Sequence, residues 1–236
     1  MPSGSLIRDG AIIRVGEPLG NFYGYIWDGI FQDSASAARS GQDGARVGGD
    51  RLRDLNGDGV VDSNDRIILG NAQPRWLFGL TSFATYKSLS VSCVVRGALD
   101  FQVVNLNRMG METPGGSTNM LRSVLDYWTP SNPTNTMTGL GIGPNSLMTS
   151  RWVEDGSFVR LQNVTVAWAV PQRLSTRLGM GQLRLYVSGQ NLHTFTRYSW
   201  YDPEVSSRGT GDLELGWDDS SYPGIKTFTF GLNVDF

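Results

Sequence analysis

Apolar and polar residues alternate one by one along several stretches of the chain. In RWLFGLTSFATY (75–86) and SLSVSCVVRG (88–97), apolar side chains collect on one face of an extended chain. The alternation is clearest in KTFTFGLNVDF (226–236), where aromatic and aliphatic residues take every second position and small or polar residues take the others. A period of two residues is typical of β-strands. The pattern therefore predicts a chain built from strands.

Four further stretches bring the number of predicted strands to seven. They are residues 11–16, 21–27, 157–170 and 182–192. Several of the seven are about 9–11 residues long, the length that a tilted strand needs to cross a bilayer. The 30 glycines and the aromatic content of 11%, with only 18% charged residues, also favour an all-β chain rich in turns.

Short and long connections alternate between these strands. The three long ones are 28–74, 101–151 and 194–224. Outer-membrane barrels have short periplasmic turns and long extracellular loops, whereas long loops are uncommon in compact soluble domains. The predicted fold is therefore an all-β, antiparallel portion of a transmembrane β-barrel with the C-terminus in the periplasm. The long connections are then extracellular loops.

An odd number of strands does not close such a barrel. Bacterial barrels have an even number of strands, and unpaired strand edges cannot face lipid. We therefore expect residues 1–236 to be part of a larger barrel. The first residues, MPSGSLIRDGAIIRVG, lack the basic and apolar regions of a signal peptide. That leaves two expectations: a cytoplasmic protein, or part of a longer chain.

The stretch DLNGDGVVDSND (54–65) has the spacing of a calcium loop. Calcium takes six to eight oxygen ligands, and a glycine at the sixth position allows the sharp turn, here Gly59. The candidate ligands are Asp54, Asn56, Asp58, the Val60 carbonyl, Asp62 and Asp65. No amphipathic helices flank the loop, so we expect Ca²⁺ to stiffen a loop and not to operate a sensor. The alternative is a solvated turn rich in Asp and Asn.

Other chemistries have little support in the sequence. The formal net charge is −2 with no Lys/Arg run, so no nucleic-acid partner is predicted. The lone cysteine, Cys93, excludes an internal disulfide and a cysteine zinc site, and His193 is the single histidine. The loop carboxylates lack the surroundings that set up a catalytic pair. No enzyme activity or catalytic residue is predicted.

The sequence resembles the SusC/RagA-type TonB-dependent outer-membrane transporters of Bacteroidota, and in particular their C-terminal part. The stretches that carry the resemblance are GNFYGYIWDGIFQ (20–32), GDRLRDLNGDGVVDSNDRIILGNAQPRWLFGLTSFATYK (49–87), DYWTPSNPT (126–134), RWVEDGSFVRLQNVTVAWAVP (151–171), LYVSGQNLHTFTRYSWYDPEV (185–205) and SYPGIKTFTFGLNVDF (221–236). Any one of them is moderately specific. Together they cover nearly the whole chain in the family's order.

This resemblance implies a role in nutrient import across the outer membrane. Family members carry an N-terminal plug domain inside the barrel, are driven by the TonB complex, and import glycans or peptides under a SusD-like surface lipoprotein. The plug is absent here, so we do not expect the chain to transport by itself. The resemblance also implies that the terminal strand is the signal for the barrel-assembly machinery. Its residues are Phe228, Phe230, Leu232, Val234 and Phe236.

Two alternative functions, and the roles of two sets of aromatic residues, are left undecided by the sequence. A soluble, calcium-stabilised, dockerin-like binding module would need a second copy of the calcium repeat. A glycoside hydrolase domain would need a carboxylate pair. Strand aromatics such as Trp76 and Trp168 could form a barrel's interfacial girdles or a sandwich core. Loop aromatics such as Trp128 and Trp217 could stack on a ligand or pack the loops.

Overall fold

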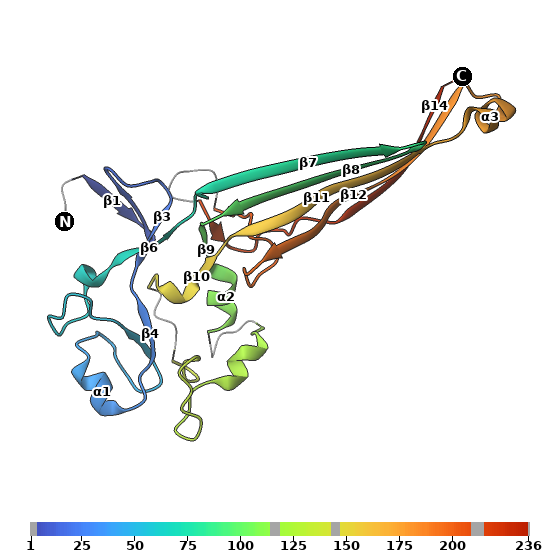
Figure 1. Cartoon of the computed structure of the whole chain (residues 1–236). Coiled ribbons are helices and arrows are strands. Elements are labelled where there is room, and N and C mark those ends of the chain that lie inside the picture. The colour runs from blue at the N-terminus through green and yellow to red at the C-terminus, as the bar shows by residue number, and fades with distance from the viewer. Residues whose placement is uncertain (1–3, 114–118, 143–146, 209–214, 236) are drawn as a thin grey trace. The chain divides into compact units, whose positions relative to one another are not determined.

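The computed structural model describes residues 4–113, 119–142, 147–208 and 215–235 (Figure 1). We expected one barrel portion over 1–236, but the chain divides into two compact units. The first comprises Met1–Gln73, Phe101–Asp155 and Glu204–Ser221; the second comprises Pro74–Asp100, Gly156–Pro203 and Tyr222–Phe236. No helix in the described ranges combines the length and the apolar character needed to span a membrane.

The second unit is a five-stranded antiparallel sheet in the order β14-β12-β11-β8-β7. Its strands are β7 (Trp76–Tyr86), β8 (Leu89–Leu99), β11 (Phe158–Ala169), β12 (Gln182–Thr196) and β14 (Thr227–Asp235). Each one coincides with a predicted strand, and β12 extends beyond its predicted end at residue 192. The long arrows of this sheet lie side by side in Figure 1. The alternating pattern thus located all five strands.

The connections within this sheet alternate in length. Strands β7 and β8 are joined by a two-residue turn at Lys87 and Ser88, where Lys87 takes the left-handed φ of 55° common in tight hairpins. Strands β11 and β12 are joined by a short segment that contains α3 (Gln172–Ser175) and the 3-10 helix η4 (Thr176–Leu178). The connections from β8 to β11 and from β12 to β14 are long and leave the opposite end of the sheet.

The described residues of the first unit form three small sheets, in the orders β1-β2-β3-β6, β10-β9-β13 and β4-β5. Their strands are β1 (Ser5–Arg8), β2 (Ala11–Arg14), β3 (Asn21–Gly24), β4 (Trp27–Ile30), β5 (Asp50–Leu52), β6 (Ile67–Asn71), β9 (Gln102–Asn105), β10 (Val153–Asp155) and β13 (Trp217–Asp218). The predicted strands 11–16 and 21–27 lie here and not in the long sheet. Our expectation of seven strands in one barrel portion is therefore corrected to five, because alternation identifies a strand but not the sheet that it joins.

The α-helices described in the first unit are short, and side chains cap their first turns. Helix α1 (Ser34–Arg39) begins where the Asp33 carboxylate accepts the Ser36 N–H at 2.7 Å, and α2 (Leu106–Met111) begins where Asn105 accepts the Arg108 N–H at 2.9 Å. The 3-10 helices are η1 (Ser63–Asp65), η2 (Arg122–Asp126) and η3 (Ser150–Trp152). The segments predicted as long loops therefore contain regular structure of their own.

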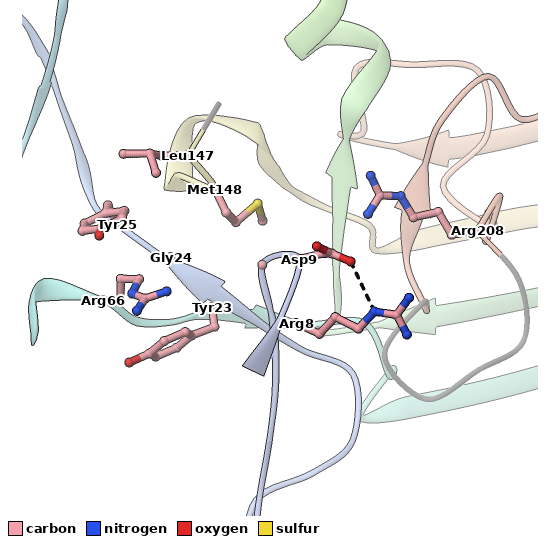
Figure 2. A pocket seen from close by; sticks show the side chains of 10 residues that line it. Arg8, Asp9, Tyr23, Gly24, Tyr25, Arg66, Leu147, Met148 and Arg208 are labelled. Carbon is pink, nitrogen blue, oxygen red and sulfur yellow. Dashed lines mark ion pairs between the residues drawn. The ribbon is translucent and has the colours of Figure 1, made fainter. Parts of the chain in front are cut away.

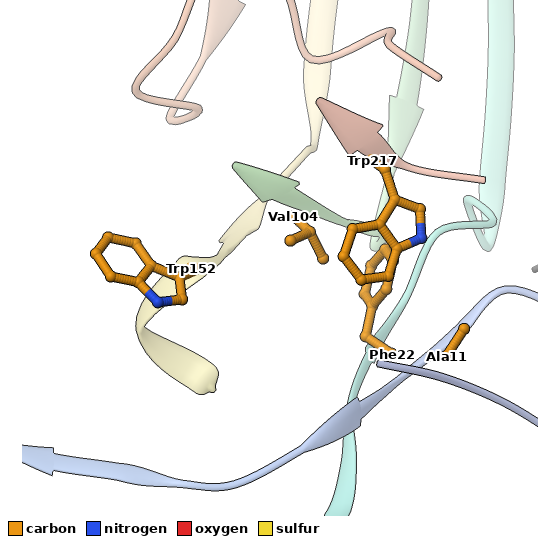
Figure 3. Packing of buried hydrophobic residues seen from close by; sticks show 5 residues of the cluster. All are labelled: Ala11, Phe22, Val104, Trp152 and Trp217. Atoms are coloured by element: carbon orange, nitrogen blue, oxygen red, sulfur yellow. The ribbon is translucent and has the colours of Figure 1, made fainter. Parts of the chain in front are cut away.

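A small apolar core holds the first unit together (Figure 3). It consists of Ala11, Phe22, Val104, Trp152 and Trp217, each at most 4% exposed. The rings of Phe22 and Trp217 meet edge to face at 5.6 Å, a geometry that contributes about 0.5–1.5 kcal/mol beyond burial. Trp217 reaches this position because β13 pairs in parallel with β9. Trp217, one of the loop aromatics, therefore packs its unit instead of standing free for a ligand.

Candidate functional site

One face of the five-stranded sheet is apolar from edge to edge. Directly paired residues of antiparallel strands share a face, so the register defines rows across the sheet. One such row consists of Ala84, Val91, Val166, Val187 and Phe230. Large side chains of this face are open to the surroundings: Phe230 is 76% exposed. Exposed apolar surfaces of this extent mark contact with a membrane or a partner.

The opposite face of the same sheet is mainly polar. The neighbouring row consists of Phe83, Ser92, Thr165, Ser188 and Thr229. The Thr165 and Ser188 hydroxyls are 2.9 Å apart, and Asn163 Nδ2 donates to Ser188 Oγ at 3.1 Å. A sheet with one apolar and one hydrogen-bonded polar face is the arrangement of a membrane barrel wall.

Aromatic residues lie at both ends of the apolar face. Tyr86 and Trp168 share a row beside the short turns, because both pair with Leu89. Trp76 lies at the other end of β7 and is 69% exposed. Aromatic rings at two such levels are the pattern of interfacial girdles, in which the ring sits at the headgroup level.

The terminal strand carries the residues predicted as an assembly signal. Phe228, Phe230 and Leu232 are each more than 60% exposed on the apolar face, and Val234 lies further along the same face. Phe236 lies outside the described residues. These positions fit lipid contact, and their use as an assembly signal stays a prediction.

The candidate calcium ligands lie in the first unit, in the segment that leads into β6. Asp54 accepts the Gly57 and Gly59 N–H groups at 2.7 and 2.8 Å, and Asn56 accepts that of Asp58 at 2.9 Å. Asp58 accepts the Val60 N–H at 2.9 Å. The side chains thus hold the loop in a series of tight turns.

The final two candidate ligands, Asp62 and Asp65, form a capping box around η1. Asp65 is fully buried, and its carboxylate accepts N–H groups from Leu55 at 2.8 Å, Asn56 at 3.3 Å and Asp62 at 2.8 Å. Burial alone would raise the pKa of Asp65, but these bonds outweigh it and lower the pKa. The ionised Asp65 carboxylate therefore joins the two ends of the loop through these hydrogen bonds.

The loop does not present a ready-made cage for a metal. Within the described ranges, no group of three or more His, Cys, Asp or Glu side chains is arranged to hold a metal ion. The Oδ1 atoms of Asp54, Asp58 and Asp65 already accept backbone N–H groups. A carboxylate has about four acceptor sites, so these residues retain capacity for a cation after a rearrangement of the loop. The calcium site stays a prediction.

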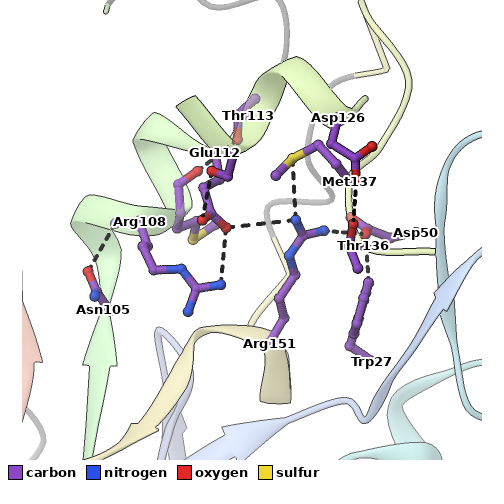
Figure 4. A network of polar contacts seen from close by, with 12 residues as sticks. Trp27, Asp50, Asn105, Arg108, Glu112, Thr113, Asp126, Thr136, Met137 and Arg151 are labelled. Carbon is purple, nitrogen blue, oxygen red and sulfur yellow. Dashed lines mark hydrogen bonds and ion pairs between the residues drawn. The ribbon is translucent and has the colours of Figure 1, made fainter. Parts of the chain in front are cut away.

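A buried cluster of charged residues, which we call the Arg151 network, escaped the sequence analysis (Figure 4). The Arg151 side chain is 6% exposed, bonds to Asp50 Oδ1 at 3.2 Å, and lies over the Trp27 and Trp152 rings at 4.9 and 4.7 Å. Burial lowers its pKa, against the opposing effect of Asp50 and Glu112. Arg151 beside Trp152 was the available signal, but its partners are distant in the sequence.

Arg108 completes this network from helix α2. It bonds to Glu112 Oε2 at 3.1 Å and to Glu154 Oε1 at 2.8 Å. Burial would lower the pKa of Arg108, but the bonds to these two carboxylates outweigh it and raise the pKa. In the second unit, Arg160 pairs with Asp202 Oδ1 at 2.5 Å. The carboxylates of Glu154 and Asp202 are thus each bound to an arginine.

Known proteins resemble the chain over most or all of its length. No protein-family model matches it. It is 34% identical to TonB-dependent receptor P3 of Formosa agariphila, across 100% of the chain and 24% of that protein. It is 33% identical to TonB-dependent receptor P26 of the same organism (94% and 23%), and 30% identical to TonB-dependent receptor SusC of Bacteroides thetaiotaomicron (78% and 17%).

Solved structures share the fold. The RagAB peptide transporter matches with a TM-score of 0.77 and 22% identity, over 99% of this chain and 24% of the other. The RagAB peptide importer in its open-open state matches with a TM-score of 0.78 and 21% identity, over 100% and 24%. The chain spans 24% or less of the length of the three curated relatives named above.

A β-rich chain with this two-faced sheet has the fold of a TonB-dependent receptor, a class of outer-membrane barrel transporters. The chain belongs to the SusC/RagA family of these receptors, as the sequence motifs predicted. The relatives do not favour the alternative of a soluble, dockerin-like module.

Proposed function

We propose that the chain forms part of an outer-membrane, TonB-dependent importer of glycans or peptides. The observation that carries this proposal is the five-stranded sheet with one continuous apolar face and one polar face. In the importer, the apolar face contacts outer-membrane lipid and the polar face lines the inside of the barrel. The chain supplies wall strands and loops, and no covalent chemistry.

The proposed orientation puts the short turns and the C-terminus in the periplasm. Support comes from the register, because Asp235 near the end of β14 pairs with Gln182 beside the short connection. The segments 28–74, 101–151 and 194–224 then belong to the extracellular side. There they form the contact surface for a SusD-like lipoprotein and for the cargo.

The proposed partners follow from the family. SusC and the RagAB complex support a SusD-like lipoprotein and energisation by the TonB complex. The TonB complex would act through parts of the importer outside this chain. The terminal strand supports recognition by the barrel-assembly machinery, since it presents Phe228 and Phe230 on the outer face.

We also propose a structural Ca²⁺ at residues 54–65. Asp54, Asn56 and Asp58 would contribute side-chain oxygens, the Val60 carbonyl would take the seventh loop position, and Asp62 and Asp65 would complete the set. The ion would stiffen the extracellular loop without acting in transport itself. The retained acceptor capacity of these carboxylates supports the site, and titration calorimetry with CaCl₂ tests it.

The importer role is tested in cells that produce the protein. After separation of the inner and outer membranes, an antibody should find the chain in the outer membrane, together with a SusD-like lipoprotein. Deletion of its coding sequence should abolish growth on an oligosaccharide or peptide source while growth on the monomer persists. Recovery of the chain in the cytosol, or unchanged growth on every polymeric source, would refute the proposal.

A further inference from the structure

A basic pocket lies in the first unit, next to the loop 54–65 and apart from the Arg151 network (Figure 2). Its volume is about 670 Å³, within the range of roughly 300–1,000 Å³ typical of small-ligand sites. Its polar lining includes Arg8, Arg66, Arg208, Tyr23 and Tyr25. Asp9 is the one acidic residue of the described lining, so three guanidinium groups face a single carboxylate.

This positive charge is local and not a property of the whole molecule. The chain carries a formal net charge of −2. Asp9 is already paired with Arg8, at 3.3 Å. Within the described part of the chain, Arg66 and Arg208 form no ion pair with a carboxylate. Within the described residues, the pocket therefore presents two guanidinium groups that are not bonded to a carboxylate.

Aromatic rings hold these two arginines in place. The Arg66 guanidinium lies 5.4 Å from the centre of the Tyr23 ring, and the Arg208 guanidinium lies 4.4 Å from that of Trp217. Stacking uses the flat face of a guanidinium and leaves its N–H groups at the edge available. Those N–H groups match the two oxygens of a carboxylate or sulfate, which Arg can bind in a bidentate manner.

Backbone hydrogen bonds join three of the segments that line the pocket. The Tyr23 N–H donates to the Gly10 carbonyl at 2.7 Å, and the Tyr25 N–H donates to the Met148 carbonyl at 2.9 Å. Gly24 allows this close approach, because a Cβ there would lie 2.1 Å from the Met148 oxygen. These contacts fix the backbone of Tyr23 and Tyr25, whose side chains line the pocket.

The same hydrogen bonds bear on the class of ligand. Extended peptides commonly bind sheets by adding a strand to a free edge. Here β3 lies inside its sheet between β2 and β6, and the N–H groups of Tyr23 and Tyr25 are already used. The walls offer charged groups for the acidic groups of an acidic sugar and phenol hydroxyls for its hydroxyls. The aromatic ring faces suit the flat faces of its rings.

We propose that the basic pocket binds acidic oligosaccharides through carboxylate or sulfate groups, with one acidic group held by Arg66 and another by Arg208 on the other side of the pocket (Figure 2). Tyr23 and Tyr25 flank the sugar rings, and Arg8 adds to the positive field at the rim. The proposal rests on the proposed import function, since it assigns an acidic glycan as cargo.

The test is titration calorimetry of the full chain in detergent with four probes. These are a uronic-acid tetrasaccharide, a sulfated tetrasaccharide, neutral maltotetraose and tetraglutamate. The uronic-acid and sulfated probes separate the two sources of the anionic group. Binding of either acidic sugar, weakened by added NaCl, with no binding of maltotetraose, is the expected result. Equal binding of the neutral sugar, or tighter binding of the acidic peptide, would overturn the proposal.

Variants locate the site. Arg66→Gln and Arg208→Gln should each weaken binding of the acidic sugar by about tenfold to a hundredfold, the usual effect of losing hydrogen bonds to a charged group. Arg75→Gln is the matched control, because Arg75 pairs with Asp100 in the second unit. Unchanged affinity in both pocket variants contradicts the proposal. Near-UV circular dichroism checks that the variants fold. If either variant misfolds, the comparison of the four probes on the unmutated protein decides whether the proposal stands.

Failure of this proposal can be told apart from failure of the import function. A chain found in the outer membrane that supports growth but binds neither acidic probe would overturn only the assignment of an acidic glycan. A chain that is absent from the outer membrane would overturn the import function itself.

Discussion

A single arginine on the apolar face of the sheet should strongly destabilise the protein in a bilayer. Val164 lies in β11, pairs with Cys93 and Gly189, and is five residues before Ala169 at the end beside the short turns. With a rise of about 3.3 Å per residue and a tilt of about 40°, it lies roughly 13 Å above that end. The apolar band of a barrel is about 25 Å tall, so Val164 is near its middle.

At that depth Val164→Arg should lower the free energy of unfolding by about 2–4 kcal/mol. The matched control is Ser92→Arg, which places the same charge at nearly the same level on the polar face, where Ser92 pairs with Thr165. It should change the free energy by less than about 1 kcal/mol. Urea unfolding of the protein in lipid vesicles, followed by tryptophan fluorescence, measures both. Equal losses for the two variants, or a larger loss for Ser92→Arg, would refute the assignment of the faces.

Three further predictions concern the first unit. Arg151→Met should destabilise this unit by about 3–5 kcal/mol, because it leaves buried carboxylates unpaired. The control Arg75→Met, at a surface ion pair, should lower the free energy of unfolding by less than about 1 kcal/mol. Thermal unfolding followed by near-UV circular dichroism measures both. The pKa of Asp65 is lowered on folding, so its contribution to stability is complete above its ordinary pKa of about 3.9 and is lost as the pH falls through the lower folded value. Asp65→Asn should therefore lower the free energy of unfolding by about 1–3 kcal/mol near neutral pH and remove this dependence on acid. Hydrogen exchange of the loop amides, measured as the pH is lowered, tests this. An acid dependence that persists in the variant would contradict the prediction. Asp58→Ala should abolish calcium binding in calorimetry while the far-UV circular dichroism of the sheet stays unchanged; retained binding would contradict the ligand assignment.

The sequence was sufficient to locate the long sheet. The alternation along 75–86 and 226–236 predicts strands whose two faces have different surroundings, and the length of the strands matches what is needed to cross a bilayer. Residues 11–16 and 21–27 lie outside the long sheet although they also alternate, because a four-residue strand buried in a small sheet carries a similar pattern. Which strands pair is decided by long-range register, which no local pattern contains.

The candidate sites differ in how visible they are in sequence. The loop 54–65 is a local motif, so its turns could be predicted. The Arg151 network and the basic pocket join segments that are far apart in the chain: Arg151 binds Asp50, and Arg66 lies in the same pocket as Arg208. Such groups are brought together by the fold of the first unit and have no spacing by which sequence could identify them.

The central claim is that the two faces of the five-stranded sheet have different surroundings, lipid and the barrel interior. Neighbouring residues of β14 test it, because Phe230 and Thr229 face opposite sides. Each would be replaced by cysteine in a Cys93→Ser background, labelled with an environment-sensitive fluorophore, and examined in vesicles that contain nitroxide-labelled lipids. The account predicts strong quenching at position 230 and little at position 229. Equal quenching at the two positions, or stronger quenching at position 229, would contradict it.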